Sequence, residues 1–171
     1  LGIIGMGRIG FAVAKRAKAF DMKIIYHSRH QKPEMEKALD IEFKPEINDI
    51  FKKADFISLH IPLSEKTHHI VNQETLSLMK KQCILINTGR GSLVDEKALI
   101  EFLKNNKIAG AGLDVYEFEP RLSNDLVNLK NTTLLPHIGS ATLETRDAMG
   151  FKVMENLKAF FKGNTPPDSI T

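Results

Sequence analysis

The chain has 171 residues, of which 42% are hydrophobic and 26% charged, as in an ordinary globular domain. Its formal charge of +3 comes from scattered basic residues, which does not suggest nucleic acid as a partner. We also expect no membrane partner, because no apolar run approaches the roughly 20 residues of a membrane span. The single cysteine, Cys83, cannot form an internal disulfide, which favours a reducing compartment and predicts a cytoplasmic protein.

Short apolar runs alternate with segments of helical spacing along the chain. The predicted strands cover residues 2–4, 23–26, 41–43, 55–59, 83–86, 108–113 and 132–135. The predicted helices cover residues 9–20, 47–53, 73–79, 96–104 and 143–161. We find no repeat, no low-complexity tract and no internal linker. The alternation predicts an α/β fold of three layers, a doubly wound parallel sheet of the Rossmann type with helices on both faces.

A glycine-rich turn, Gly5-Met6-Gly7-Arg8-Ile9-Gly10, follows the first predicted strand and opens the first helix. In this setting the GxGxxG spacing predicts a phosphate cradle for a dinucleotide. Gly5 allows the tight turn, Gly7 leaves room for a pyrophosphate, and Gly10 lets the helix pack against the strand. The N-terminus of that helix favours negative charge. The alternative for the motif alone is a flexible turn before a helix.

The end of the second predicted strand indicates which dinucleotide binds. An NAD site usually carries an acid there that holds the ribose 2′-hydroxyl, and no Asp or Glu lies between Lys23 and Lys32. Ser28 stands where the acid is expected, and Arg29 follows it. An arginine fork holds a 2′-phosphate that an acid would repel. We therefore predict NADP(H) as the preferred cofactor, with NAD(H) as the alternative if Arg29 is only a solvated loop charge.

Two residues just beyond predicted strand ends suit the reduction of a carbonyl compound. His137 follows the strand at 132–135, at the edge where open α/β sheets bind ligands, and histidine titrates near neutral pH. We predict that it donates the proton. Arg90 lies between two glycines, which leaves room for an anionic substrate to reach its guanidinium fork. The alternative for Arg90 is a salt bridge in a loop.

A carboxylate beside the histidine would fix its tautomer and favour its protonated form. Glu117 and Glu119 both qualify, because the two would point the same way if the segment is extended. His68 and His69 are neighbours in the sequence, so we expect them not to converge on one metal ion, and we predict no metal site. His60 ends a predicted strand shortly before Pro62, which favours a loop that lines the cofactor.

Four blocks in this order resemble the D-isomer-specific 2-hydroxyacid dehydrogenases, and the resemblance covers nearly all of the chain. The blocks are residues 5–10, Ile86-Asn87-Thr88-Gly89-Arg90-Gly91, Gly112 through Glu119-Pro120, and Pro136-His137-Ile138-Gly139-Ser140-Ala141-Thr142. The resemblance implies that Arg90, Glu119 and His137 are the catalytic residues, which favours Glu119 over Glu117. The cofactor contacts that it implies fall on Arg8, Ile9, Pro62, Thr67, Thr88, Asp114 and Gly139.

The segment 137–142, together with Ser28-Arg29, most resembles the glyoxylate/hydroxypyruvate and 2-ketogluconate reductase branch. This implies an oxidoreductase that reduces small 2-oxo acids to D-2-hydroxy acids by hydride transfer, and a homodimer. The family has a second domain that holds the substrate. We therefore expect residues 1–171 to be a dinucleotide-binding domain excised from a two-domain parent whose substrate domain is absent, and to catalyse little alone.

Two other functions stay open at this point. The family includes corepressors, so a dinucleotide-sensing regulatory or scaffold protein of the same fold is the first alternative. The second is another class of Rossmann enzyme, which would lack the ordered arginine, glutamate and histidine.

Overall fold

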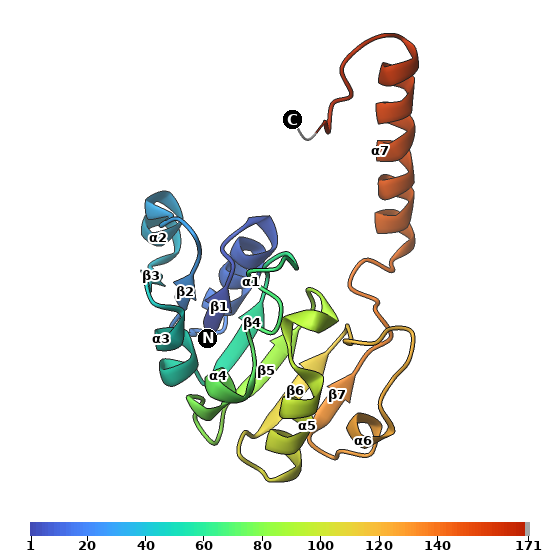
Figure 1. The fold of residues 1–171 in the computed structure, drawn as a ribbon. Helices are drawn as coiled ribbons and strands as arrows, with labels where there is room; N and C mark the ends of the chain where they lie inside the picture. Colours follow the sequence, from blue (N-terminus) through green and yellow to red (C-terminus); the bar gives the residue numbers. More distant parts are fainter. Residues whose placement is uncertain (170–171) are drawn as a thin grey trace. The chain divides into compact units, whose positions relative to one another are not determined.

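The computed structural model describes residues 1–169, in two compact units that are described separately below (Figure 1). The first unit is Leu1–Pro136, and the second begins at His137. The strands of the first unit are β1 (Gly2–Ile4), β2 (Ile25–His27), β3 (Glu42–Phe43), β4 (Phe56–Leu59), β5 (Ile84–Asn87), β6 (Gly110–Leu113) and β7 (Thr132–Leu134). Its helices are α1 (Arg8–Lys18), α2 (Pro33–Leu39), α3 (Ile47–Lys53), α4 (Gln73–Ser77), the 3₁₀ helix η1 (Gly91–Leu93), α5 (Glu96–Lys104) and α6 (Asn124–Val127).

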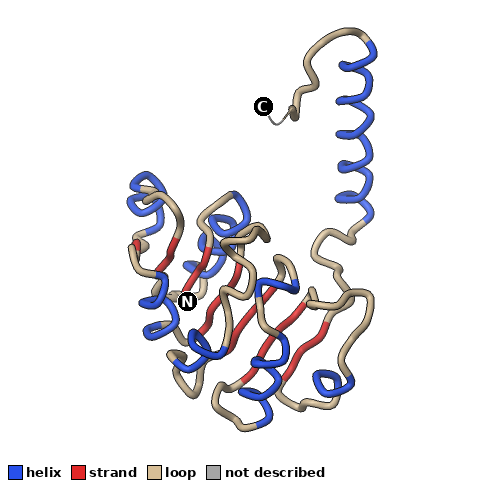
Figure 2. The backbone as a smooth tube through the Cα atoms, viewed as in Figure 1, coloured by secondary structure: helices blue, strands red, loops and turns tan. Residues whose placement is uncertain are grey.

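The seven strands form one parallel sheet in the order β3-β2-β1-β4-β5-β6-β7. The chain winds outward from β1 to one edge and then returns to continue from β4 to the other edge. This is the doubly wound Rossmann arrangement, whose topological switch point lies between β1 and β4. The predicted fold class is therefore confirmed, and Figure 2 shows the helices that accompany the strands.

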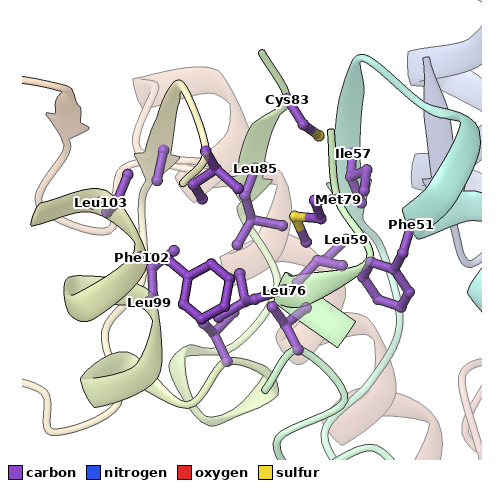
Figure 3. Packing of buried hydrophobic residues seen from close by; sticks show 14 of the residues in the cluster. Phe51, Ile57, Leu59, Leu76, Met79, Cys83, Leu85, Leu99, Phe102 and Leu103 are labelled. Atoms are coloured by element: carbon purple, nitrogen blue, oxygen red, sulfur yellow. The ribbon is translucent and has the colours of Figure 1, made fainter. Parts of the chain in front are cut away.

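Two hydrophobic clusters pack the first unit, one against each face of the sheet. The neighbouring residues Ile3 and Ile4 belong to different clusters, because successive side chains of a strand point to opposite faces. The larger cluster joins β4, β5 and β6 to helices α3, α4 and α5, with Phe51, Leu76 and Leu99 nearly or fully buried (Figure 3). The smaller cluster joins β1 and β2 to α1 and α2. Helices on both faces give the three layers that the sequence predicts.

The second unit contains helix α7 (Leu143–Phe161). Thr142 caps the helix, since its hydroxyl accepts a hydrogen bond from the backbone N–H of Thr145 at 3.3 Å. Large apolar side chains of α7 are exposed; they are Leu143, Met149, Phe151, Val153, Met154, Leu157, Phe160 and Phe161. No helix among residues 1–169 is long and apolar enough to cross a membrane.

The predicted elements agree with the structure apart from their ends and three omissions. Helices α3, α5 and α7 and strand β1 have the predicted bounds, and the other strands differ by one or two residues at their ends. Helices α2, α6 and η1 were not predicted from the sequence, and neither was the boundary between the two units. Helix α2 is seven residues long and has no fully buried residue, so its apolar residues Met35, Ala38 and Leu39 span too few turns to give a clear helical signal.

Candidate functional site

The register of the sheet aligns the ends of six strands in one row. Paired residues run from His27 through Ile4, Leu59, Asn87 and Leu113 to Leu134. The next residue along each chain segment therefore lies at the same carboxyl edge of the sheet; these include Ser28, Gly5, His60, Thr88 and Asp114. Ligands of open α/β sheets bind at this edge, at the switch point. Of the predicted cofactor residues, the register places Gly5, Ser28, Thr88 and Asp114 at this edge.

The glycine turn between β1 and α1 has the geometry of a phosphate cradle. Gly5 adopts a φ of +100°, a conformation that side chains other than glycine rarely reach. A Cβ atom on Gly10 would lie 2.0 Å from the carbonyl oxygen of Gly5, so only glycine fits at this contact between helix and turn. A Cβ on Gly7 would meet nothing within 4 Å, which leaves open space in front of the α1 N-terminus. A pyrophosphate would bind in this space, where the backbone N–H groups of the α1 N-terminus can donate to it.

A hollow of about 230 Å³ adjoins the cradle and contains Ser28 and Arg29. His30 and Lys32 also line it, and Arg29 and Lys32 bring positive charge to this hollow. The Ser28 hydroxyl donates a hydrogen bond to the His30 carbonyl oxygen at 2.6 Å, which shapes the loop. Within the described part of the chain, no Asp or Glu lines this hollow. Sequence reasoning missed Lys32, although its position three residues after Arg29 was the available signal.

A second hollow, of about 440 Å³, continues along the same edge toward Arg90. Its lining includes Ile9, Thr88 and Arg90, and it shares His60, Ile61 and Pro62 with the first hollow. His60 lines both hollows, and its predicted place beside a cofactor stays a prediction. The His60 Nε2 lies 2.8 Å from the Ser58 hydroxyl, and burial lowers the pKa of His60.

Thr67 and Asp114 line neither of these two hollows. The Thr67 hydroxyl donates to the carbonyl oxygen of Pro62 at 2.7 Å and accepts from the N–H of Ser64 at 2.8 Å, so Thr67 closes the loop after β4. Asp114 is buried, and its backbone N–H donates to the carbonyl oxygen of Asn87 at 3.0 Å. A larger hollow of about 660 Å³ along α5 contains none of the predicted site residues.

Arg90 lies in a loop that packs closely on the segment after β6. The Arg90 Nη1 donates to the Gly89 carbonyl oxygen at 2.7 Å, and the Asn87 side chain donates to the Arg90 carbonyl oxygen at 2.9 Å. A Cβ on Gly91 would lie 1.8 Å from the carbonyl oxygen of Tyr116. Gly91 therefore allows a close approach of two backbone segments, in addition to the open space for a substrate that the sequence suggested.

Glu117 and Glu119 have different surroundings, which corrects the extended geometry considered for this segment. Residues 117–120 form a turn. Glu119 is exposed, and its Oε1 accepts a hydrogen bond from the backbone N–H of Tyr116 at 2.8 Å. Glu117 is directed elsewhere: its Oε1 lies 2.6 Å from Nε2 of His69, and its Oε2 accepts from the backbone N–H of Glu96 at 3.1 Å. The two carboxylates therefore do not share one position.

His68 and His69 lie closer together than their adjacency suggested. Their rings stack with centroids 3.9 Å apart. One potential ligand atom from each of them and one from Glu117 lie within 4.8 Å of one another, so the argument that sequence neighbours do not converge does not hold for these two histidines. The direct hydrogen bond between His69 and Glu117 already uses two of the three groups.

The predicted site residues divide between the two units. Arg90, Glu119 and the cofactor residues from Gly5 to Asp114 belong to the first unit, whereas His137 and Gly139 belong to the second. The catalytic assignment therefore stays a prediction.

Comparisons with known proteins agree with this geometry. Residues 1–139 match the family model of the D-isomer specific 2-hydroxyacid dehydrogenase, NAD binding domain. The glyoxylate reductase of Thermococcus litoralis is 54% identical over 170 residues, which are 99% of this chain and 51% of that protein. The glyoxylate reductase of Pyrococcus horikoshii is 52% identical over the same shares. This chain thus spans about half the length of the curated relatives it matches.

Solved structures give the same result. An NADPH-dependent glyoxylate/hydroxypyruvate reductase from Sinorhizobium meliloti, crystallised with NADP and malonate, is 42% identical with a TM-score of 0.88. The alignment covers 94% of this chain and 49% of that one. A nicotinamide dinucleotide is therefore the cofactor class that this fold accommodates. The chain belongs to the D-isomer specific 2-hydroxyacid dehydrogenase family, as its NAD binding domain.

Proposed function

We propose that the full-length protein reduces small 2-oxo acids, of the glyoxylate or hydroxypyruvate type, to D-2-hydroxy acids. The observation that carries this proposal is the pair of adjoining hollows at the carboxyl edge of the sheet. One contains the glycine cradle, and the other contains Arg90, so a dinucleotide and an anionic substrate would meet along one edge. The relatives named above are glyoxylate reductases, which supports the same substrate class.

The side chains divide the chemistry in the following way. A bound reduced nicotinamide supplies the hydride. Arg90 holds the carboxylate or the ketone oxygen of the substrate with its guanidinium fork. His137 donates a proton to the oxygen that becomes the hydroxyl group, and Glu119 favours the protonated imidazole. The dinucleotide is held by the glycine turn, at Gly5, Gly7, Arg8, Ile9 and Gly10. Further contacts come from Pro62, Thr67, Thr88, Asp114 and Gly139.

Turnover by the full-length protein tests this function. With NADPH and glyoxylate or hydroxypyruvate, we expect steady oxidation of NADPH and formation of the D-hydroxy acid. We expect the 171-residue chain to bind the dinucleotide and to turn over poorly, because the part that would exclude water from the substrate is lacking. Dinucleotide binding without turnover by the full-length protein would instead support the regulatory or scaffold alternative.

We propose further that NADP(H) is the preferred cofactor, because Arg29 and Lys32 line the hollow beside the cradle and no carboxylate of the described chain does. We expect calorimetric titration of this chain to give a lower Kd for NADPH than for NADH. Replacing Arg29 with alanine should weaken NADPH binding about ten- to a hundredfold, since a hydrogen bond to a charged group contributes about 1.5–3 kcal/mol. NADH binding should stay unchanged.

The matched control for this titration is Arg16→Ala. Arg16 lies near the C-terminal end of α1, where its Nη1 donates to the carbonyl oxygen of Ala12 at 2.9 Å. Arg16→Ala lowers the net charge by the same amount as Arg29→Ala, and it should leave the affinities for NADPH and NADH unchanged. Equal losses of NADPH affinity in the two variants would contradict a 2′-phosphate contact at Arg29, and tighter binding of NADH would overturn the preference itself.

We propose a homodimer as the working assembly, in the cytoplasm. The exposed apolar side chains of α7 support association, since a helix with apolar residues on several sides is stable in water only when covered. The single buried cysteine supports a reducing compartment. Light scattering on the full-length protein should give twice the mass of one chain, and a monomer at micromolar concentration would contradict the proposal.

A further inference from the structure

Three segments of the first unit contact one another: the loop after β4, the loop that carries Arg90 and the turn that carries Glu119. The backbone N–H of His69 donates to the carbonyl oxygen of Ser92 at 2.9 Å, and Val71 forms an isolated parallel β-bridge with Val94. These contacts attach the loop after β4 to the loop that carries Arg90. On its other side, the Arg90 loop touches the backbone of Tyr116 at Gly91, as described above. The Arg90 loop therefore contacts both the loop after β4 and the turn that carries Glu119.

Glu117 lies where these segments meet, and both of its carboxylate oxygens have partners. The Oε1 pairs with His69 of the loop after β4, and the Oε2 accepts from the backbone N–H of Glu96 at the start of α5. The backbone N–H of Glu117 in turn donates to Oε2 of Glu96 at 3.2 Å. The Glu117 side chain is only 13% exposed. A carboxylate this well enclosed and bonded at both oxygens fixes the position of its backbone.

The surroundings of Glu96 support this arrangement. Glu96 is buried, and burial is the main reason that its pKa lies above the ordinary value. The hydrogen bond from the Glu117 backbone lowers the pKa of Glu96, whereas the negative charge of Glu117 raises it. Two acidic side chains thus lie together at this junction, where each is bonded to the backbone of the other. Such a reciprocal pair holds two segments in one relative position.

We infer that Glu117 is a positioning residue, which holds the turn carrying Glu119 against the loop carrying Arg90 through its bonds to His69 and Glu96. This inference rests on the proposed function, because it gives Arg90 and Glu119 their roles. It assigns separate tasks to the two glutamates of one short segment. Glu119 serves the reaction, and Glu117 keeps Glu119 in place from two residues away.

Substitution of Glu117 in the full-length protein tests this role. We expect Glu117→Ala to lower kcat for glyoxylate about ten- to a hundredfold, since a displacement of about 1 Å at a catalytic group costs rates of this order. The Kd for NADPH should stay within about twofold, because the hollows that contain the cradle do not include Glu117. Glu117→Gln should restore most of the activity, because its amide oxygen can accept from Glu96 and its NH₂ can bond to His69.

His69→Asn gives a second variant that removes one of the two bonds. Asparagine tolerates the left-handed φ of +50° found at His69, and its shorter side chain does not reach Glu117. We expect a smaller loss of kcat than in Glu117→Ala, with NADPH binding unchanged. This variant keeps the inference testable if Glu117→Ala does not fold. Glu101→Ala, on the exposed part of α5, is the matched control and should keep the wild-type kcat.

The possible failures are distinguishable. If the wild-type protein turns over glyoxylate but Glu117→Ala and His69→Asn keep kcat within about twofold, the positioning role is wrong while the proposed function stands. A purely structural role would reduce kcat and NADPH binding together, and Glu117→Gln would not recover kcat selectively. If the wild-type protein turns over no 2-oxo acid, the proposed function fails and this inference fails with it.

Discussion

Replacing His137 with glutamine in the full-length protein is expected to lower kcat for glyoxylate reduction about 10²- to 10⁴-fold, the usual contribution of a positioned acid or base. Glutamine keeps a similar length and hydrogen-bonding capacity, but it cannot donate a proton to the forming alkoxide at neutral pH. NADPH binding should stay near its wild-type value, because the substitution leaves the glycine cradle and Arg29 unchanged. Initial rates of NADPH oxidation, with the Kd measured separately, give both quantities.

The control for this variant is Lys52→Gln, which places the same residue at an exposed position of α3 outside the two hollows. Its kcat should match that of the wild type. Full activity in His137→Gln would remove His137 as the proton donor and leave the fold and the cofactor site untouched. A loss of the same size in both variants would mean that glutamine at either position disturbs the protein in a general way.

Gly10→Ala is expected to lower the stability of the folded chain more than the same substitution at Gly7 or Gly150. The added Cβ would lie 2.0 Å from the carbonyl oxygen of Gly5 and 3.3 Å from the Cγ2 of Ile3, so α1 must move away from β1. Overpacking of this kind costs about 1–3 kcal/mol and sometimes more. We therefore expect a lower midpoint of urea unfolding, together with loss of dinucleotide binding. Circular dichroism and calorimetry on the 171-residue chain measure the two effects.

The same methyl group at two other glycines separates folding from binding. Gly7→Ala adds its Cβ in open space, so stability should be kept while the pyrophosphate site is obstructed. Gly150→Ala, inside α7 and also in open space, should leave binding unchanged and raise helix stability by up to about 1 kcal/mol. Wild-type stability in Gly10→Ala would mean that the turn at Gly5 can open without cost, which would contradict the tight contact.

Much of the fold was predictable because its strongest signals are local. Helices α3 and α5 have apolar residues at regular spacing, and their observed ends match the predicted ones. Helix α2 gives only a weak form of this signal, because it is seven residues long and has no fully buried side chain, although Pro33 at its first turn was a usable start signal. Helix α6 is only four residues long, too short for any periodic pattern. The boundary after Pro136 has no change in composition and emerges only from contacts between distant residues.

The sequence also predicted the positions of some candidate site residues, but not of others. Strand ends in a parallel sheet share one edge, so the places of Gly5, Ser28 and Thr88 followed from the pattern alone. The distinction between Glu117 and Glu119 did not, because it depends on a turn and on hydrogen-bond partners from two other segments. Only the resemblance to a family favoured Glu119; the structure shows that Glu117 is bonded to His69 and Glu96, and the catalytic role of Glu119 stays a prediction.

Because Cys83 is buried, its reactivity toward a thiol reagent can measure how often the hydrophobic core of this chain becomes exposed. The thiol lies in the larger hydrophobic cluster with no exposed surface, and burial raises its pKa to about 11 (Figure 3). It is also the single cysteine of the 171 residues. A thiol reagent can therefore modify the folded chain only during excursions that expose the core beside β5. The rate of labelling measures how often that happens, and its slowing on addition of a dinucleotide would measure the rigidity that the ligand confers.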